Sequence, residues 1–312
     1  MSSIGDVVHA LPVATALRRR YPRLRITWAV ESWTTPLVHG HPAIDRIVTF
    51  PPMRWRHASR DWLRSFTQAM RELRSERYDV SLDLQGLLKS AVVALCSRAP
   101  IRIGMHGQRE GAALRDVRSE SHDLPVQAEA ATAVERILSA LHIPPRRPLI
   151  VINPSTSAEW KTWPVRRWAR VAEALAAHGS VVLVGSREQM ARHAELVRNT
   201  APQPDDFTGR TTLAELVALL DRCTIHLAGD TGSAHIAAAL GRPVVGLYEP
   251  TTPQRKAPYG YESLVVYHAG QCRAGCPRFC WRNRPCLQAV TPAEVIARAR
   301  EILAGSTPAV AG

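Results

Sequence analysis

A run of small polar residues directly before an alanine-rich segment is the first candidate for chemistry. Residues 227–235 (LAGDTGSAH) lead from an apolar run through a turn into that segment. If the segment is a helix, the free amides of residues 231–233 and the helix dipole form an anion site suited to a diphosphate. Ordinary turn chemistry with Asp230 as the N-cap explains the stretch equally well, and a lone histidine such as His235 is more often packed than a ligand.

A lysine among hydroxyl residues is the second candidate. Residues 153–164 (NPSTSAEWKTWP) follow another apolar run, and lysine occurs only three times in the chain. The ammonium of Lys161, with the hydroxyls of Ser155 and Thr156, could neutralise charge that develops on a leaving phosphate. The competing interpretation is a solvated loop lysine.

Two carboxylates, those of Asp6 and Glu188, are candidates for a role in catalysis or in binding. Asp6 precedes a segment that we expect to be helical from Pro12, because proline suits the first turn of a helix. In a loop or first turn facing a cleft, Asp6 could act as a general base, and a capping aspartate is the alternative. Glu188, just after a predicted strand, could bind ribose hydroxyls.

Four of the six cysteines crowd one short segment with the spacing C-x3-C-x3-C-x5-C. In a reducing compartment this favours a metal over disulfides, but the spacing matches neither the usual zinc pairs nor a common iron–sulfur run. We therefore expect structural thiols and no catalytic metal, and buried packing for Cys96 and Cys223. The four crowded residues are Cys272, Cys276, Cys280 and Cys286.

Short Val- and Ile-rich runs alternate with segments of helical period, which is typical of βα units on a parallel sheet. Strands are predicted at 26–30, 46–50, 78–84, 101–104, 149–153, 181–185, 224–229 and 243–248. Helices are predicted at 12–20, 62–76, 86–97, 128–141, 165–177, 188–199, 212–222, 233–240 and 292–303. The fold class is therefore α/β, with two doubly wound, Rossmann-like domains and a ligand cleft at the carboxyl ends of their strands.

The domain boundary is predicted at the proline-rich stretch 142–148, which cannot continue a helix. It divides the chain into residues 1–145 and 146–312. Because the chain opens in what reads as a loop after a strand, we also expect an apolar strand upstream, without which the first sheet would lack a central member.

The charge balance favours an acidic partner. Forty basic and 27 acidic residues give a net charge of +13, which suits a phosphorylated lipid, a membrane surface or nucleic acid, or reflects an arginine-rich genome. The chain shows no nucleic-acid-binding signature, no G-x-G-x-x-G or P-loop, no run long enough to span a bilayer and no export signal. We therefore expect a cytoplasmic protein that binds neither nucleic acid nor nicotinamide nor ATP.

Taken in order, these stretches resemble the lipopolysaccharide heptosyltransferases of glycosyltransferase family nine over nearly the whole chain. The first and last landmarks are specific together, and the others support them. The landmarks are residues 2–12 (SSIGDVVHALP), 82–90 (LDLQGLLKS), 109–110 with 133–136, 161–164 (KTWP) and 229–235 (GDTGSAH).

The resemblance implies an inverting enzyme of the GT-B fold without a cofactor. The amino domain, closest to heptosyltransferase I, would bind Kdo–lipid A or inner-core lipopolysaccharide at the inner face of the cytoplasmic membrane, and the carboxyl domain would bind ADP-heptose. Asp6 would deprotonate the acceptor, and Lys161 would stabilise the departing ADP. The remaining contacts implied are Ser155, Thr156, Glu188, Asp230, Thr231, Gly232 and His235 for the donor, and Arg56, Arg109 and Arg136 for the acceptor.

Two other functions stay open. One is a family-nine transferase that uses another nucleotide sugar, which a panel of donors would reveal. The other is a non-catalytic, two-domain protein that binds polyanions.

Overall fold

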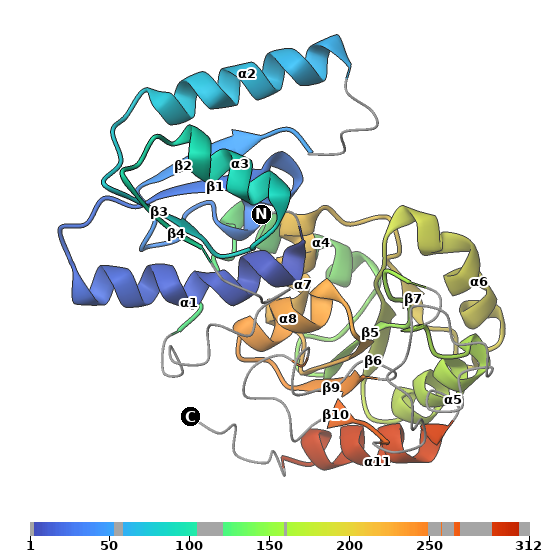
Figure 1. The fold of residues 1–312 in the computed structure, drawn as a ribbon. Coiled ribbons are helices and arrows are strands. Elements are labelled where there is room, and N and C mark those ends of the chain that lie inside the picture. The colour runs from blue at the N-terminus through green and yellow to red at the C-terminus, as the bar shows by residue number, and fades with distance from the viewer. Residues whose placement is uncertain are drawn as a thin grey trace. The chain divides into compact units, whose positions relative to one another are not determined.

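The computed structural model describes residues 3–52, 59–104, 121–158, 161–248, 257, 265–268 and 289–305 (Figure 1). The chain forms two compact units, Met1–Pro125 and Val126–Gly312. Each is built of parallel strands and helices, which confirms the predicted α/β class. Within the described residues no helix is long and apolar enough to span a bilayer.

The units divide before the predicted boundary at residue 145. Helix α4 (Ala128–Ala140) belongs to the second unit, where it packs against α7 (Leu213–Arg222). Arg222 Nε donates to Glu135 Oε1 at 3.1 Å, an exposed contact between the two helices. The proline-rich stretch 142–148 is therefore a set of turns inside the second unit.

In the first unit, helix α1 (Ile4–Arg20) begins earlier than predicted. The Ser3 side chain caps it by accepting from the Asp6 amide at 3.1 Å. Pro12 lies inside the helix, not at its start, and an interior proline costs about 3 kcal/mol. Val7, Val8 and Leu11 are buried on the same helix, and each such side chain contributes about 1.5–3 kcal/mol. This burial outweighs the cost of the proline.

The strands described in the first unit form two separate parallel pairs. β1 (Thr27–Glu31) pairs with β2 (Arg46–Phe50), and β3 (Val80–Asp83) pairs with β4 (Ile101–Gly104). The connecting elements are the 3₁₀ helix η1 (Ser32–Leu37), α2 (Arg60–Arg74) and α3 (Leu88–Cys96). The strands and helices predicted here are confirmed, whereas η1 was not predicted.

The second unit has a six-stranded parallel sheet in the order β10-β9-β8-β5-β6-β7. Its central strands β5 (Leu149–Asn153) and β8 (Ile225–Gly229) are buried along their whole length, as parallel strands covered on both faces must be. The chain winds outward from β5 to β7 and then returns to β8 on the other side of β5. This is the doubly wound order, with its switch point between β5 and β8.

The remaining elements of this unit agree with the predicted ranges to within a few residues, except that the two-residue strands β7 (Asp205–Asp206) and β10 (Val265–Val266) were not predicted. The elements that agree with the prediction are β6 (Ser180–Leu183), β9 (Val244–Leu247), α5 (Val165–Ala176), η5 (Arg187–Gln189), α6 (Met190–Arg198), α8 (Gly232–Ala239) and α11 (Pro292–Leu303).

Candidate active site

The switch point gathers the predicted donor residues of the second unit. β5 ends at Asn153 and β8 ends at Gly229, and the two strands are hydrogen-bonded neighbours. Gly229 permits close approach here, because a Cβ on it would lie 2.6 Å from Thr156 Cγ2. The loop after β5 and the loop after β8 therefore meet, as ligand-binding loops do at a switch point.

Lys161 and Asp230 form an ion pair across these two loops. Lys161 Nζ lies 2.6 Å from Asp230 Oδ2, and their side chains are only 16% and 11% exposed. Partial burial makes the pair stronger than a surface salt bridge, because water screens it less. The predicted cation is thus held at the carboxyl end of β8, and it is not a solvated loop lysine.

The amino end of α8 follows directly after this pair. Thr231 is the N-cap, not Asp230, and its side chain makes no capping hydrogen bond with the described residues. Gly232 begins the helix and has no Cβ that could stand beside the first-turn amides. An anion placed there would meet main-chain N–H groups, the positive end of the helix dipole and the nearby ammonium.

A buried chain of hydrogen bonds supports the start of α8. His226 Nδ1 lies 2.9 Å from the carbonyl oxygen of Val151, which can only accept. Burial lowers the pKa of His226 to about 4, so the ring is neutral and Nε2 accepts from Ser233 Oγ at 3.0 Å. Asn153 Nδ2 in turn donates to Ser233 Oγ at 3.0 Å. These hydrogen bonds link the ends of β5 and β8 to the first turn of α8 and form one rigid corner of the fold.

The hydroxyls of the predicted donor residues Ser155 and Thr156 are engaged within the fold. Ser155 Oγ lies 2.9 Å from His193 Nε2, and His193 Nδ1 lies 2.5 Å from Thr208 Oγ1. Thr156 Oγ1 donates to the Ala158 carbonyl at 2.7 Å. Burial lowers the pKa of His193 to about 4, so the imidazole is neutral and bridges the two hydroxyls. The described side chains shape the loop that carries Lys161, and their contact with a donor stays a prediction.

Three further residues complete this end of the sheet. Glu188 is exposed on η5, just beyond β6, and His235 is buried on α8. Tyr248 follows β9 and is fully buried; burial, reinforced by the charge of Asp230, raises the pKa of its hydroxyl well above the ordinary value. Its hydroxyl has no hydrogen-bond partner within the part of the chain that the structure describes.

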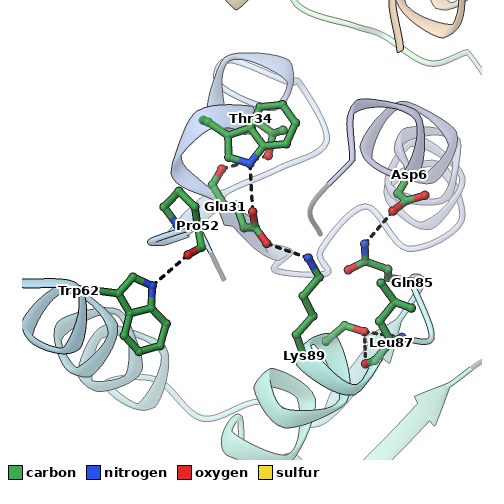
Figure 2. Close-up of polar contacts among 10 residues, drawn as sticks. Asp6, Glu31, Thr34, Pro52, Trp62, Gln85, Leu87 and Lys89 are labelled. Carbon is green, nitrogen blue, oxygen red and sulfur yellow. Dashed lines mark hydrogen bonds and ion pairs between the residues drawn. The ribbon is translucent and has the colours of Figure 1, made fainter. Parts of the chain in front are cut away.

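In the first unit, Asp6 lies in the first turn of α1. A loop or a first turn was predicted, and the structure shows the second. Gln85, in the loop between β3 and α3, donates from Nε2 to Asp6 Oδ2 at 2.7 Å (Figure 2). The Gln85 side chain is only 4% exposed, so this contact holds one carboxylate oxygen in place.

An ion pair lies in the same unit, at the carboxyl end of β1. Lys89 Nζ lies 3.0 Å from Glu31 Oε1, and Trp33 Nε1 donates to Glu31 Oε2 at 3.0 Å (Figure 2). The loop that carries Gln85 and leads to Lys89 in the first turn of α3 is shaped by Asp83, whose Oδ1 accepts from the amides of Gln85 and Gly86, both at 3.0 Å. The carboxyl ends of β1 and β3 therefore present a carboxylate and a cation within one unit.

The arginines predicted to bind the acceptor do not lie beside Asp6 in the described part of the first unit. Arg136 is exposed on α4 in the second unit, with Nε 3.5 Å from the Thr132 carbonyl. Arg56 and Arg109 lie outside the described residues, as do the four crowded cysteines. Among the residues described, no group of His, Cys, Asp and Glu could hold a metal ion. Cys223 is buried as predicted, and Cys96 is half-buried.

Sequence reasoning missed several residues of these sites. Gln85 and Lys89 stand in a landmark run, but no role was assigned to them. Asn153 stands at the end of an apolar run and His226 within one, and His193 stands in a mixed stretch (residues 190–196, MARHAEL) that carries no local signal. A histidine inside the buried strand β8 requires partners. Those partners are distant in sequence, so only the fold reveals them.

Comparisons with known proteins agree with this arrangement. The sequence model "Glycosyltransferase family 9 (heptosyltransferase)" matches residues 66–144 and 120–280. The chain is 31% identical to lipopolysaccharide heptosyltransferase 1 of Pseudomonas aeruginosa, over 83% of this chain and 79% of that one. It is 27% identical to lipooligosaccharide heptosyltransferase 2 of Haemophilus influenzae, over 85% and 86%.

Solved structures show the same fold. A family 9 glycosyltransferase from Veillonella parvula superposes with a TM-score of 0.83 at 19% identity, covering 98% of this chain and 95% of that one. Escherichia coli ADP-heptose lipopolysaccharide heptosyltransferase II gives 0.74 at 22% identity, covering 98% and 97%. An E. coli heptosyltransferase with ADP gives 0.72 at 24% identity, covering 97% and 98%. The predicted GT-B fold is thereby confirmed.

Proposed function

Because the chain belongs to glycosyltransferase family 9, we propose that it transfers heptose from ADP-heptose to the Kdo-containing inner core of a lipid A-linked acceptor, with inversion at the anomeric carbon. The observation that carries the proposal is the Lys161–Asp230 pair at the start of α8. A cation beside free helix amides, at a switch point, is suited to a nucleotide diphosphate.

The donor contacts follow from this position. The amides of Thr231 and Gly232 and the ammonium of Lys161 bind the two phosphates, while Glu188 binds the ribose. His235 lies one turn further along α8, on the sugar side. An E. coli relative was solved with ADP-2-deoxy-2-fluoro heptose, which supports a nucleotide-heptose donor.

The reaction is a direct displacement. The acceptor hydroxyl forms the new bond to the anomeric carbon and gives its proton to Asp6, while the bond from that carbon to the phosphate oxygen breaks. The electron pair leaves with ADP, whose new charge is stabilised by Lys161 and the α8 amides. No metal has a part in this scheme.

The acceptor is acidic and lipid-linked, which the charge distribution supports. Helix α2 exposes Arg60, Arg64 and Arg71 beside the exposed side chain of Leu63. Guanidinium groups with an adjacent apolar side chain suit an anionic membrane surface. Arg56, Arg109 and Arg136 are the proposed contacts to the acceptor carboxylate or phosphate, where a guanidinium can pair in a bidentate manner.

The test is incubation of the purified chain with ADP-heptose and a set of core-truncated lipid A acceptors. We expect release of ADP and a product one heptose heavier, with the anomeric configuration inverted. UDP- and GDP-sugars serve as the matched donor panel, and Asp6→Asn is the inactive control. Transfer from a different donor alone would select the other nucleotide-sugar function. Acceptor binding without transfer from any donor would contradict a catalytic role.

A further inference from the structure

Tyr248 carries a buried hydroxyl that the described fold does not use. Its side chain is fully buried directly after β9, and its hydroxyl has no hydrogen-bond partner within the residues that the structure describes. The ring lies against Gly246, where a Cβ would stand only 2.5 Å from Tyr248 Cε2. A buried hydroxyl without a partner costs free energy, and a phenylalanine would fill the same space without that cost. The hydroxyl would therefore gain from a state of the site that brings it an acceptor.

An acceptor stands at the neighbouring strand end. β8 and β9 are parallel and hydrogen-bonded, and their last paired residues are Gly229 and Leu247. Asp230 and Tyr248 directly follow this pair, so they start from strand ends about 5 Å apart. Burial raises the pKa of the Tyr248 hydroxyl well above its ordinary value, and the charge of Asp230 adds to this rise. The hydroxyl therefore keeps its proton at neutral pH and can offer it to a carboxylate.

The Asp230 carboxylate will need such a donor when a nucleotide binds. In the structure Lys161 Nζ lies 2.6 Å from Asp230 Oδ2, and the Asp230 side chain is only 11% exposed. In the proposed function the same ammonium binds the donor diphosphate. A diphosphate that draws the ammonium away leaves a largely buried carboxylate short of its counter-charge, which is costly. The carboxylate then lacks a donor, and the Tyr248 hydroxyl lacks an acceptor.

We propose that Tyr248 is a positioning residue of the donor site: when a diphosphate engages the Lys161 ammonium, the Asp230 carboxylate turns to the Tyr248 hydroxyl and accepts its hydrogen bond. This role rests on the proposed function, because it needs a ligand that carries a diphosphate. The exchange is a rotation of the Asp230 side chain, and the proton stays on the tyrosine oxygen. It compensates the carboxylate and stops it from competing with the phosphates for the ammonium.

The test is Tyr248→Phe in the full chain. The stability of the nucleotide-free variant should not fall, because the hydroxyl has no partner there in the described residues. The Kd for ADP, measured by calorimetry, should rise about tenfold, because a hydrogen bond to a charged group is lost from the complex alone. The donor KM should rise with it while kcat changes by less than about twofold, because the contact is present before and during the reaction.

A matched control and a double-mutant cycle identify the partner. Tyr78→Phe also removes a buried hydroxyl that has no partner in the described residues, but in the first unit, and it should leave the Kd for ADP unchanged. Asp230→Asn replaces the carboxylate by a neutral acceptor, to which a hydrogen bond is roughly half as strong. In that background Tyr248→Phe should raise the Kd for ADP only about threefold.

The inference is overturned if Tyr248→Phe binds ADP as the parent chain does, if Tyr78→Phe weakens ADP equally, or if the tenfold loss persists in full beside Asp230→Asn. A clear loss of stability in the nucleotide-free Tyr248→Phe chain would also overturn it, because the hydroxyl would then have a partner before the nucleotide binds. A parent chain that bound no ADP would overturn the proposed function as well. A parent chain that bound ADP and transferred heptose, with Tyr248→Phe unaffected, would overturn the role of Tyr248 alone.

Discussion

Replacing Lys161 by methionine removes the ammonium and keeps the apolar stem, so it isolates the charge. A hydrogen bond to a charged group contributes about 1.5–3 kcal/mol. Lys161 already has a charged partner at 2.6 Å in Asp230, so a phosphate must compete with that carboxylate. We therefore expect the lower end, about 1.5 kcal/mol, which is about a tenfold rise in the Kd for ADP. Turnover should fall further, by about a hundredfold, because charge grows on the leaving phosphate.

The assay is calorimetric titration with ADP beside steady-state rates at fixed ionic strength. Lys89→Met is the matched control, since it breaks a similar pair with Glu31 at 3.0 Å in the other unit. Asp230→Asn removes the competing carboxylate and should leave ADP binding unchanged or tighter. If Lys161→Met bound ADP as the parent chain does, or Lys89→Met weakened ADP equally, the phosphate role of Lys161 would be refuted.

The same substitution has a cost in stability that the assay must allow for. Lys161→Met leaves the Asp230 carboxylate, 11% exposed, without its counter-charge. The loss should be about 1–2 kcal/mol, below the 3–5 kcal/mol of a fully buried pair, because some water reaches the site. Titrations should therefore run well below the melting temperature of the variant.

Four other outcomes are expected. Asp6→Asn should lower turnover by about 10²- to 10⁴-fold with ADP affinity unchanged; near-parental turnover would return Asp6 to a structural role in the first turn. The pKa of His226 is about 4 in the fold and 6.5 ordinarily, so the unfolded chain binds the extra proton between these values; urea midpoints should be highest above pH 6.5 and fall as the pH drops toward 4, less steeply in His226→Asn. Tyr248→Phe should be neutral or stabilising by up to about 1 kcal/mol in urea unfolding, because it removes a buried hydroxyl without a partner in the described residues; a clear loss would reveal a partner for that hydroxyl. Chelator treatment should leave transfer intact, whereas activity lost with chelator and restored by zinc would assign a metal to the crowded cysteines.

The elements that sequence predicts well are those whose own pattern decides them. Strand β2 was predicted residue for residue, because its β-branched and aromatic side chains suit a pleated, half-buried surface. The predicted start of α1 at Pro12 is too late, because the pair Ser3 and Asp6 begins the helix and Pro12 lies inside it. Their spacing of three residues is the signal of a helix start, and the fold uses it.

The elements that sequence misses depend on tertiary pairing. β7 consists of Asp205 and Asp206, which disfavour strands and are extended here only because they pair with β6. The ion pair of Lys161 with Asp230 joins two runs that were each singled out, but nothing in either run predicts their contact. The hydrogen bonds of Ser155 to His193 and of Asn153 to Ser233 likewise join distant segments. The partner of each of these residues therefore cannot be predicted from a local sequence pattern.

The buried chain through Ser233 bears on how donor preference could diverge among relatives. The one hydroxyl proton of Ser233 is committed to His226, so this side chain has none to offer an anion at the start of α8. A diphosphate there is met by main-chain amides, which respond to charge and shape and are present whatever side chains surround them. The sugar must therefore be discriminated by other groups, and those can change while the corner made by β5, β8 and α8 stays as it is. One phosphate-binding scaffold could in this way serve descendants that carry different sugars.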